Sequence, residues 1–149
     1  MFAGQYHLLK LFDDTLATLA RHGHPFETDA PRAAAFAGAD HVSVDSLPTL
    51  ELMDQALTEQ RLTCNVASHV SSALVGVLVV LNGDALLTLP SSLASILQKQ
   101  FGLIRIDQPL PPVPFPLRLM WHSSYDRDEC HQWVRGDLAK IAQEIADAA

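Results

Sequence analysis

Cysteine is scarce in this 149-residue chain, which contains only Cys64 and Cys130. A domain of this length can bury roughly two thirds of its unfolded surface without a covalent staple. Both cysteines lie in segments with apolar periodicity, so we expect two buried thiols in a reducing cytoplasm rather than a disulfide. Apolar residues make up 48% of the chain and charged residues 18%, which excludes a disordered acidic tail and is typical of a packed globular protein.

Long apolar runs are missing as well. The longest, Ala73 to Leu81, has about nine residues, whereas a helix that spans a bilayer needs roughly twenty. Met1 to Leu11 lacks the basic start and the following apolar run of a signal peptide. We therefore expect a soluble, cytoplasmic protein that has no membrane partner.

Positive charge is sparse, since ten Lys and Arg residues are spread thinly along a chain of net charge −7. Proteins that bind nucleic acids directly neutralise phosphates with clustered Lys and Arg side chains. The sequence has no such stripe. We therefore expect no direct contact between this chain and DNA.

Motifs of catalysis and metal binding are absent too. The sequence has no HExxH, no CxxC, no Gly-x-Ser-x-Gly and no glycine-rich phosphate loop. Cys130 has only His131 as a basic neighbour, so we interpret it as a core residue of a helix. The seven histidines form no typical zinc spacing, although two groups lie close in sequence: His22 with His24, and His122 with Asp126, Cys130 and His131. We expect no catalytic residues, no metal ligands and no cofactor, while an enzyme without a recognisable motif stays open to an activity screen.

Strand and helix patterns alternate along the chain. Apolar alternation predicts strands at Tyr6–Phe12, Thr15–Ala20, His41–Asp45, Thr63–Val70, Ala85–Leu89, Leu103–Ile106 and Leu117–His122. The first two could also be one bent strand. Helical periodicity predicts helices at Arg32–Ala37, Thr49–Gln60, Ala73–Leu81, Leu93–Phe101 and beyond Asp126. This spacing indicates an α/β fold, with a largely parallel sheet and helices on both faces.

Three helix starts carry capping signals. Ser71-Ser72 precedes the apolar helix, Ser91-Ser92 precedes the next one, and Asp126 with Glu129 has the spacing of a capping box. The last helix has an apolar face that should pack on a sheet, formed by Cys130, Trp133, Val134, Leu138, Ile141 and Ile145.

Three stretches resemble one family in its own order. The segment from Leu110 to Leu138, LPPVPFPLRLMWHSSYDRDECHQWVRGDL, resembles the C-terminal end of the effector-binding domain of LysR-type transcriptional regulators. There a proline-rich loop, a strand that ends in Trp-His, an Asp-rich turn and a His-x-Trp-x-Arg helix close the chain. LFDDTLATLARHGHP (Leu11 to Pro25) and ALLTLPSSLA (Ala85 to Ala94) are weaker matches.

The resemblance implies a periplasmic-binding-protein-like fold of type 2 with two Rossmann-like subdomains. Residues 1–149 would form an incomplete effector-binding domain, in which Arg21 to Ser92 is the second subdomain. Tyr6–Phe12 and Leu103 to Ala149 would belong to the first subdomain, whose opening half is missing, as is the DNA-binding domain. Exposed sheet edges should follow from this, so we expect self-association into a homo-oligomer, most simply a homodimer.

Effector pockets of this family lie between the subdomains, where strands end and helices begin. The corresponding strand-to-helix junction offers Ser68, His69, Ser71 and Ser72, and Ser43 ends the preceding strand. We predict that these five residues bind the effector. The serines could instead only cap the helix or pack in the core, and His69 could be an ordinary surface histidine.

The resemblance thus implies the ligand-sensing and oligomerisation domain of a bacterial regulator, which binds a small anionic or aromatic molecule without catalysis. An alternative is a non-catalytic interaction module that pairs with itself or with a full-length regulator and binds no ligand.

Overall fold

The computed structural model describes residues 5–148 and divides the chain into two compact units. The larger unit is Thr15–Val113, and the smaller unit combines the two ends of the chain, up to Asp14 and from Pro114 onward. The backbone therefore passes between the units twice. No helix in the described part of the chain is both long and apolar enough to span a membrane.

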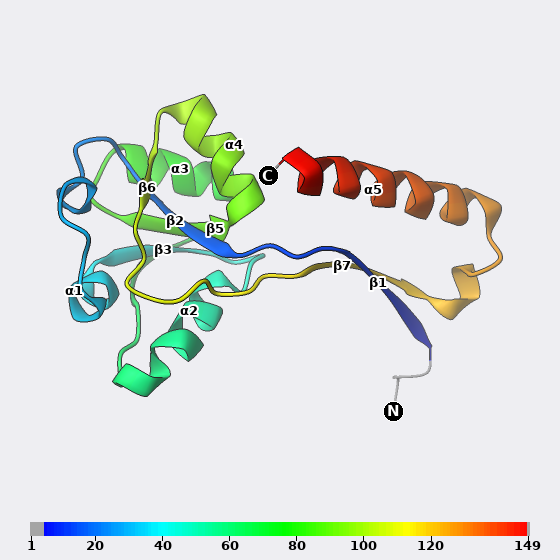
Figure 1. Ribbon diagram of the computed structural model, residues 1–149, viewed down its shortest axis with the longest axis horizontal. Helices are drawn as coiled ribbons and strands as arrows, with labels where there is room; N and C mark the ends of the chain where they lie inside the picture. The colour runs from blue at the N-terminus through cyan, green and yellow to red at the C-terminus, as the bar shows by residue number, and fades with distance from the viewer. Residues whose placement is uncertain (1–4, 149) are drawn as a thin grey trace. The chain divides into compact units, whose positions relative to one another are not determined.

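A five-stranded sheet forms the centre of the larger unit (Figure 1). Its order is β4-β3-β5-β2-β6, where the strands are β2 (Leu16–Ala20), β3 (Asp40–Val44), β4 (Asn65–Val70), β5 (Leu86–Pro90) and β6 (Ile104–Ile106). Strand β3 is parallel to β4 and β5, whereas β2 is antiparallel to β5 and β6. The sheet is thus mixed, and the predicted parallel arrangement holds only for β4, β3 and β5.

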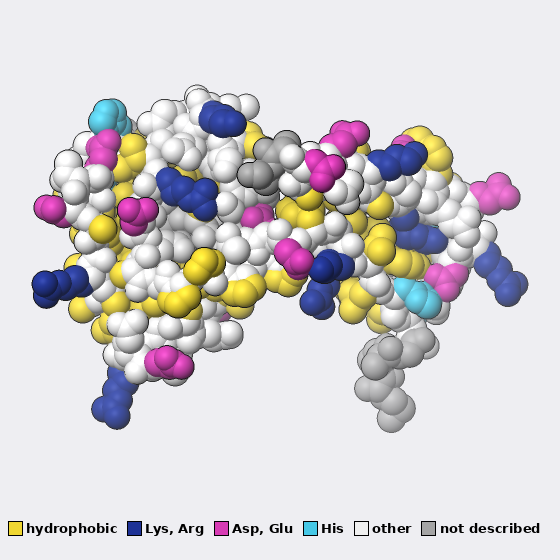
Figure 2. All heavy atoms as spheres, in the orientation of Figure 1, with side chains coloured by type: hydrophobic (Ala, Val, Ile, Leu, Met, Phe, Trp, Pro, Cys, Tyr) yellow, Lys and Arg dark blue, Asp and Glu magenta, His cyan; other side chains and the backbone are white. Residues whose placement is uncertain are grey.

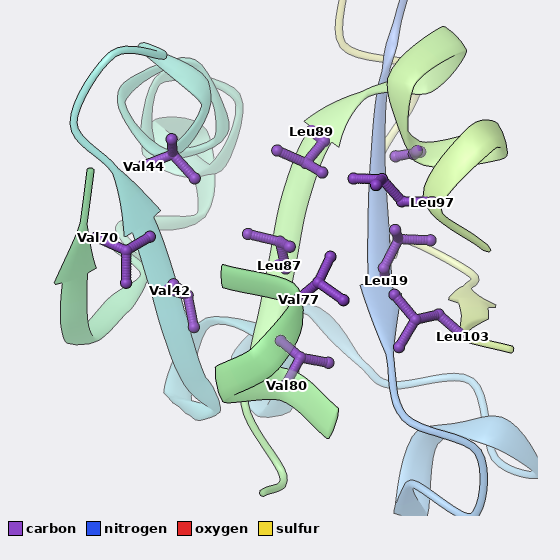
Figure 3. Packing of buried hydrophobic residues seen from close by; sticks show 12 residues of the cluster. Leu19, Val42, Val44, Val70, Val77, Val80, Leu87, Leu89, Leu97 and Leu103 are labelled. Atoms are coloured by element: carbon purple, nitrogen blue, oxygen red, sulfur yellow. The ribbon is translucent and has the colours of Figure 1, made fainter. Parts of the chain in front are cut away.

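Helices cover both faces of this sheet, as predicted (Figure 1). On one face lie α3 (Ala73–Leu81) and α4 (Ser91–Phe101), and on the other lie α1 (Ala33–Gly38) and α2 (Thr49–Leu57). The core under α3 and α4 is built by alternate strand residues such as Leu19, Val42 and Leu87, which meet Val77 and Val80 of α3 (Figure 3). The sheet strands therefore each supply every second side chain to this layer.

Strand β6 differs from the prediction, which grouped Leu103–Ile106 with the first subdomain. It is the edge strand of the five-stranded sheet, where Thr18 pairs with Ile106 and Ala20 with Ile104. Three residues and a following proline loop carry little pattern of their own, so only the pairing with β2 reveals the sheet to which this strand belongs.

Helix α4 begins two residues earlier than predicted. Pro90 is its N-cap residue and Ser91 its first helical residue, so neither Ser91 nor Ser92 occupies the predicted capping position. Proline has no side-chain acceptor, so this helix begins without a side-chain cap. The Oγ of Ser91 instead accepts a hydrogen bond of 2.7 Å from Nη2 of Arg105 on β6.

The smaller unit consists of a two-stranded antiparallel sheet and one helix. Strands β1 (Tyr6–Phe12) and β7 (Leu117–His122) pair along their length, and the helix α5 (Glu129–Ala148) packs beside β1. Strands β1 and β2 belong to different sheets, so the alternative of one bent strand is wrong.

The start of α5 also departs from the predicted capping box. Asp128, not Asp126, caps the helix, because its Oδ1 accepts a hydrogen bond of 2.8 Å from the backbone N–H of His131. Residues Ser123–Tyr125 form a separate 3-10 turn, which delays the helix start. Cys130, predicted to be buried, is exposed in the first turn of α5.

The apolar face of α5 is not buried within the described chain. Trp133 is 67% exposed and Ile141 52%, and Val134, Leu138 and Ile145 are also exposed. We call Val134, Leu138, Ile141 and Ile145 the α5 stripe. Figure 2 shows further hydrophobic side chains at the surface of the molecule. The prediction that this face packs on a sheet is therefore wrong for these residues.

Candidate functional site

The five residues predicted to bind an effector lie around the carboxyl ends of β3 and β4. These strands are parallel, and their register places Ser43 opposite His69 and Val42 opposite Ser68. Parallel strands end at the same edge of a sheet, so the two predicted strand residues are neighbours. Ser71 and Ser72 follow directly, where β4 leads into α3. We call this group the polar edge.

Ser72 has a structural role that the sequence also offered as an alternative. It is the N-cap of α3, and its Oγ accepts a hydrogen bond of 3.4 Å from the backbone N–H of Val75. Ser71 beside it is exposed. Capping accounts for Ser72 without a ligand, whereas no such role is evident for Ser71.

An acidic residue, Asp45, also belongs to the polar edge. Its Oδ1 lies 3.6 Å from Nδ1 of His69, and both side chains are mostly exposed. Sequence analysis did not select Asp45, although its place at the end of the predicted strand His41–Asp45 was a usable signal. A carboxylate here opposes an anionic ligand unless the imidazole of His69 is protonated.

A hollow of about 200 Å³ opens at the same end of the sheet, where β2 begins and β6 ends. It is lined by Thr15, Leu16, Ala17, Arg105, Ile106, Asp107, Gln108, Leu110 and Pro112. Strand β6 runs antiparallel to β2, which runs antiparallel to β5, so β6 and β3 end on the same side. Strand β3 is two strand spacings from β2 and three from β6, so Ser43 lies roughly 10 to 14 Å from the two strands that line the hollow.

Backbone hydrogen bonds between distant segments create this hollow. The N–H of Leu16 donates to the carbonyl of Val113 at 2.9 Å, and that of Ser91 donates to the carbonyl of Thr15 at 2.7 Å. These bonds hold the proline loop along the start of β2. Sequence analysis missed Arg105, Asp107 and Gln108 because only the pairing of β6 with β2 brings them to one place.

Two polar side chains of the hollow are held by the sheet and its helix. Arg105 donates to Ser91 Oγ, and the Nε2 of Gln108 donates to Oγ1 of buried Thr18 at 2.9 Å. Thr18 in turn shares a hydrogen bond of 2.8 Å with Thr88 across β2 and β5. The residues that line the hollow thus include an arginine, an aspartate and a glutamine besides apolar residues.

The residues with shifted pKa values in the larger unit do not lie in the hollow. His41 is fully buried, its Nε2 hydrogen-bonds the carbonyl of Phe36 at 2.8 Å, and burial lowers its pKa. Burial, with the carboxylate of Asp54 nearby, raises the pKa of the Cys64 thiol to about 12. Cys64 is thus protonated at neutral pH and a poor nucleophile.

His22 and His24, which lie close in sequence, each hydrogen-bond to a protein group. Nδ1 of His22 lies 2.8 Å from Glu27 Oε2, whose pKa is lowered by this hydrogen bond, whereas Nε2 of His24 lies 3.0 Å from the carbonyl of Asp84. Within residues 5–148, no three His, Cys, Asp or Glu side chains gather into a group that could hold a metal.

Comparison with known proteins identifies the family. The family model of the LysR substrate binding domain matches residues 3–141, so the chain belongs to this family. The transcriptional regulator SyrM of Rhizobium meliloti is 31% identical over 136 residues, which cover 89% of this chain and 41% of SyrM. The chain thus spans about two fifths of the length of this curated relative.

Solved structures agree on the fold. A putative transcriptional regulator from Vibrio parahaemolyticus aligns with a TM-score of 0.81 and 16% identity, over 96% of this chain and 66% of that one. The effector-binding domain of QuiR in complex with shikimate aligns with a TM-score of 0.66 and 16% identity, over 97% and 65%. At these identities the likeness concerns the fold alone. The predicted class, α/β and periplasmic-binding-protein-like of type 2, is confirmed.

Proposed function

We propose that this chain is the ligand-sensing part of a bacterial LysR-type transcriptional regulator in the cytoplasm. It binds a small anionic or aromatic effector, and it has no catalytic activity and no cofactor. The observation that carries the proposal is that the hollow and the polar edge lie at the same end of the five-stranded sheet. The complex of QuiR with shikimate supports a small-molecule ligand for this fold. We take the larger unit to be the second subdomain.

At the polar edge, Ser43, Ser68 and Ser71 supply hydroxyl groups that donate to or accept from the ligand. His69 adds an imidazole that can donate or accept a hydrogen bond, and the carboxylate of Asp45 next to it selects against an anion at this spot. Ser72 joins them while it caps α3. The anionic part of the effector is therefore expected nearer to the hollow than to Asp45.

A thermal-shift screen of small carboxylates and aromatic acids on the purified chain tests the proposal. An effector is expected to raise the unfolding temperature, and the rise should grow with the logarithm of its concentration above the Kd. Ser43→Ala and His69→Ala are expected to weaken that shift, whereas Ser124→Ala, in the smaller unit, is the control and leaves it unchanged. If no compound in the screen shifts unfolding, effector binding by this chain is refuted.

We also propose self-association through the smaller unit. Its two-stranded sheet leaves one edge each of β1 and β7 without a strand partner among residues 5–148. A two-stranded sheet is only marginally stable unless further surface covers it, and the exposed α5 stripe adds an uncovered apolar surface. A second copy of the chain would cover both features.

Light scattering after size exclusion measures this directly. The wild-type chain is expected to form a dimer or larger species, and Leu138→Asp or Ile141→Asp to shift it toward monomer. Gln143→Asp places a carboxylate on the same helix outside the α5 stripe and is the matched control. A wild-type monomer throughout the micromolar range would rule out self-association.

The α5 stripe also supports the second candidate, an interaction module that pairs with a full-length regulator and binds no ligand. Co-purification with a tagged regulator of the same host would then succeed without metabolites and fail for Leu138→Asp. Dependence of co-purification on an effector would favour ligand sensing instead.

A further inference from the structure

We propose that the hollow beside β6 binds a small carboxylic acid that also carries a hydroxyl or amino group. Arg105 binds the carboxylate, and Asp107 accepts a hydrogen bond from the second group. This inference rests on the proposed effector binding and names the class of ligand. It uses residues of the larger unit alone, all within Thr15–Val113.

Arg105 is well placed to meet a carboxylate. In the sheet it lies opposite Leu19, so both side chains lie on the face covered by α3 and α4. Its Nη2 donates to Ser91 Oγ at 2.7 Å, which fixes the side chain next to the hollow. A guanidinium has five N–H donors in a planar fork, so further donors serve a ligand carboxylate, in the geometry of a bidentate pair.

The amino end of α4 adds to the positive potential at this place. Ser91, the hydrogen-bond partner of Arg105, is the first residue of this eleven-residue helix. Helix amino ends carry a partial positive charge that favours anions within about one turn. The guanidinium of Arg105 and the amino end of α4 therefore both attract an anion.

Asp107 determines the second part of the ligand. It follows Arg105 by two residues, just beyond the end of β6, and both residues line the hollow. A carboxylate of Asp107 accepts hydrogen bonds and repels a second anion. The ligand therefore needs a donor a few bonds away from its own carboxylate.

Size and floor of the hollow limit the rest of the ligand. Its volume of about 200 Å³ is below the roughly 300 to 1,000 Å³ of sites for drug-sized molecules. Leu16, Ala17 and Ile106 are buried and give the floor an apolar surface. Gln108, bonded to Thr18, holds the loop after β6 in place. A compact acid with a small apolar body fits this description.

Three probes separate these features on the full chain. Mandelate has a carboxylate and a hydroxyl, phenylacetate has only the carboxylate, and mandelamide has only the hydroxyl. Binding is followed by NMR through the side-chain Nε–H signal of Arg105, together with backbone signals. Mandelate is expected to bind best, phenylacetate more weakly, and mandelamide about tenfold more weakly than mandelate. Arg105→Gln should remove the preference for mandelate over mandelamide, and Asp107→Ala, which removes the acceptor, the preference over phenylacetate.

Arg61→Gln, at an exposed arginine that follows α2, is the control and should leave all three affinities unchanged. Equal affinities for the three probes, no effect of Arg105→Gln, or no change in the Arg105 signal would each overturn the inference. If the probes instead perturb only Ser43 and His69, effector binding stands and the hollow does not bind the acid. If the Arg105 signal does not respond and no compound in the thermal-shift screen stabilises the chain, the sensing function fails together with the hollow.

Discussion

The indole Nε1 of Trp121 donates a hydrogen bond of 2.8 Å to Oδ1 of Asp126. The other carboxylate oxygen, Oδ2, lies 2.9 Å from Nε2 of His7 on β1, and the rings of His7 and Trp121 are stacked. Arg135 of α5 places its guanidinium 4.5 Å from the centre of the Trp121 ring. The carboxylate of Asp126 thus ties β1 to β7, and its backbone carbonyl accepts a hydrogen bond from Nε2 of Gln132 in α5.

Replacing Asp126 and Asp128 separates these roles. Asp128→Ala removes the cap of α5 and is expected to reduce helix content and to cost about 1 kcal/mol of stability. Asp126→Ala removes the partner of the Trp121 indole, for a similar loss of about 1 kcal/mol, but leaves the helix content unchanged. Far-UV circular dichroism and urea unfolding measure both quantities. If Asp126→Ala reduced the helix content and Asp128→Ala did not, the capping-box prediction would be correct after all.

Gly76 of α3 packs directly on β5. A Cβ added there would lie 2.9 Å from Cδ1 of Leu87, which is fully buried. Gly76→Ala is expected to destabilise the chain by about 1–2 kcal/mol, since the core must shift. Gly136→Ala in α5 has nothing within 4 Å and should stabilise by up to about 1 kcal/mol through helix propensity. Urea unfolding of both variants checks this, and a stabilising Gly76→Ala would contradict the packing.

His41 should make the chain sensitive to acid. In the unfolded chain it titrates near its ordinary pKa of 6.5, whereas in the folded chain burial lowers its pKa. As the pH falls below about 6.5, the unfolded state binds more protons, so the free energy of unfolding falls. His41→Gln should reduce this fall between neutral and acidic pH in urea titrations. An unchanged pH dependence in His41→Gln would contradict the assignment.

The two cysteines should differ sharply in reactivity. Cys130 is exposed, whereas Cys64 is buried and has a pKa of about 12. A thiol reagent such as DTNB is expected to modify one thiol quickly and the second only after unfolding. Cys130→Ser should abolish the fast reaction and leave the slow one. A fast thiol that persists in Cys130→Ser would show that Cys64 is accessible.

Local patterns in the sequence predicted the elements well where neighbouring residues decide them. The helix Ala73–Leu81 has the predicted bounds, and Ser72 caps it as its position suggested. Strands Tyr6–Phe12 and Leu117–His122 also have the predicted bounds. In these segments the cap, the turn residues and the apolar pattern all act within a few residues.

The sequence patterns gave wrong or no predictions where contacts with residues distant in the sequence decide the structure. The apolar face of α5 predicted burial, but periodicity shows only that a face exists and not which surface covers it. Asp126 has the spacing of a cap, but the indole of Trp121 and the imidazole of His7 compete for its carboxylate. The hollow at Arg105 depends on hydrogen bonds between residues almost a hundred positions apart, such as that of Leu16 with Val113.

By itself, the sequence determined the alternation of strands and helices, the cap of α3 and the segments that mark the family, because each depends on short-range chemistry. Only the tertiary structure decided the antiparallel place of β2, the sheet to which β6 belongs and the meeting of Arg105, Asp107 and Gln108 at one hollow. Strand order is set by long-range pairing and by burial of the sheet faces, and neither leaves a pattern in adjacent residues.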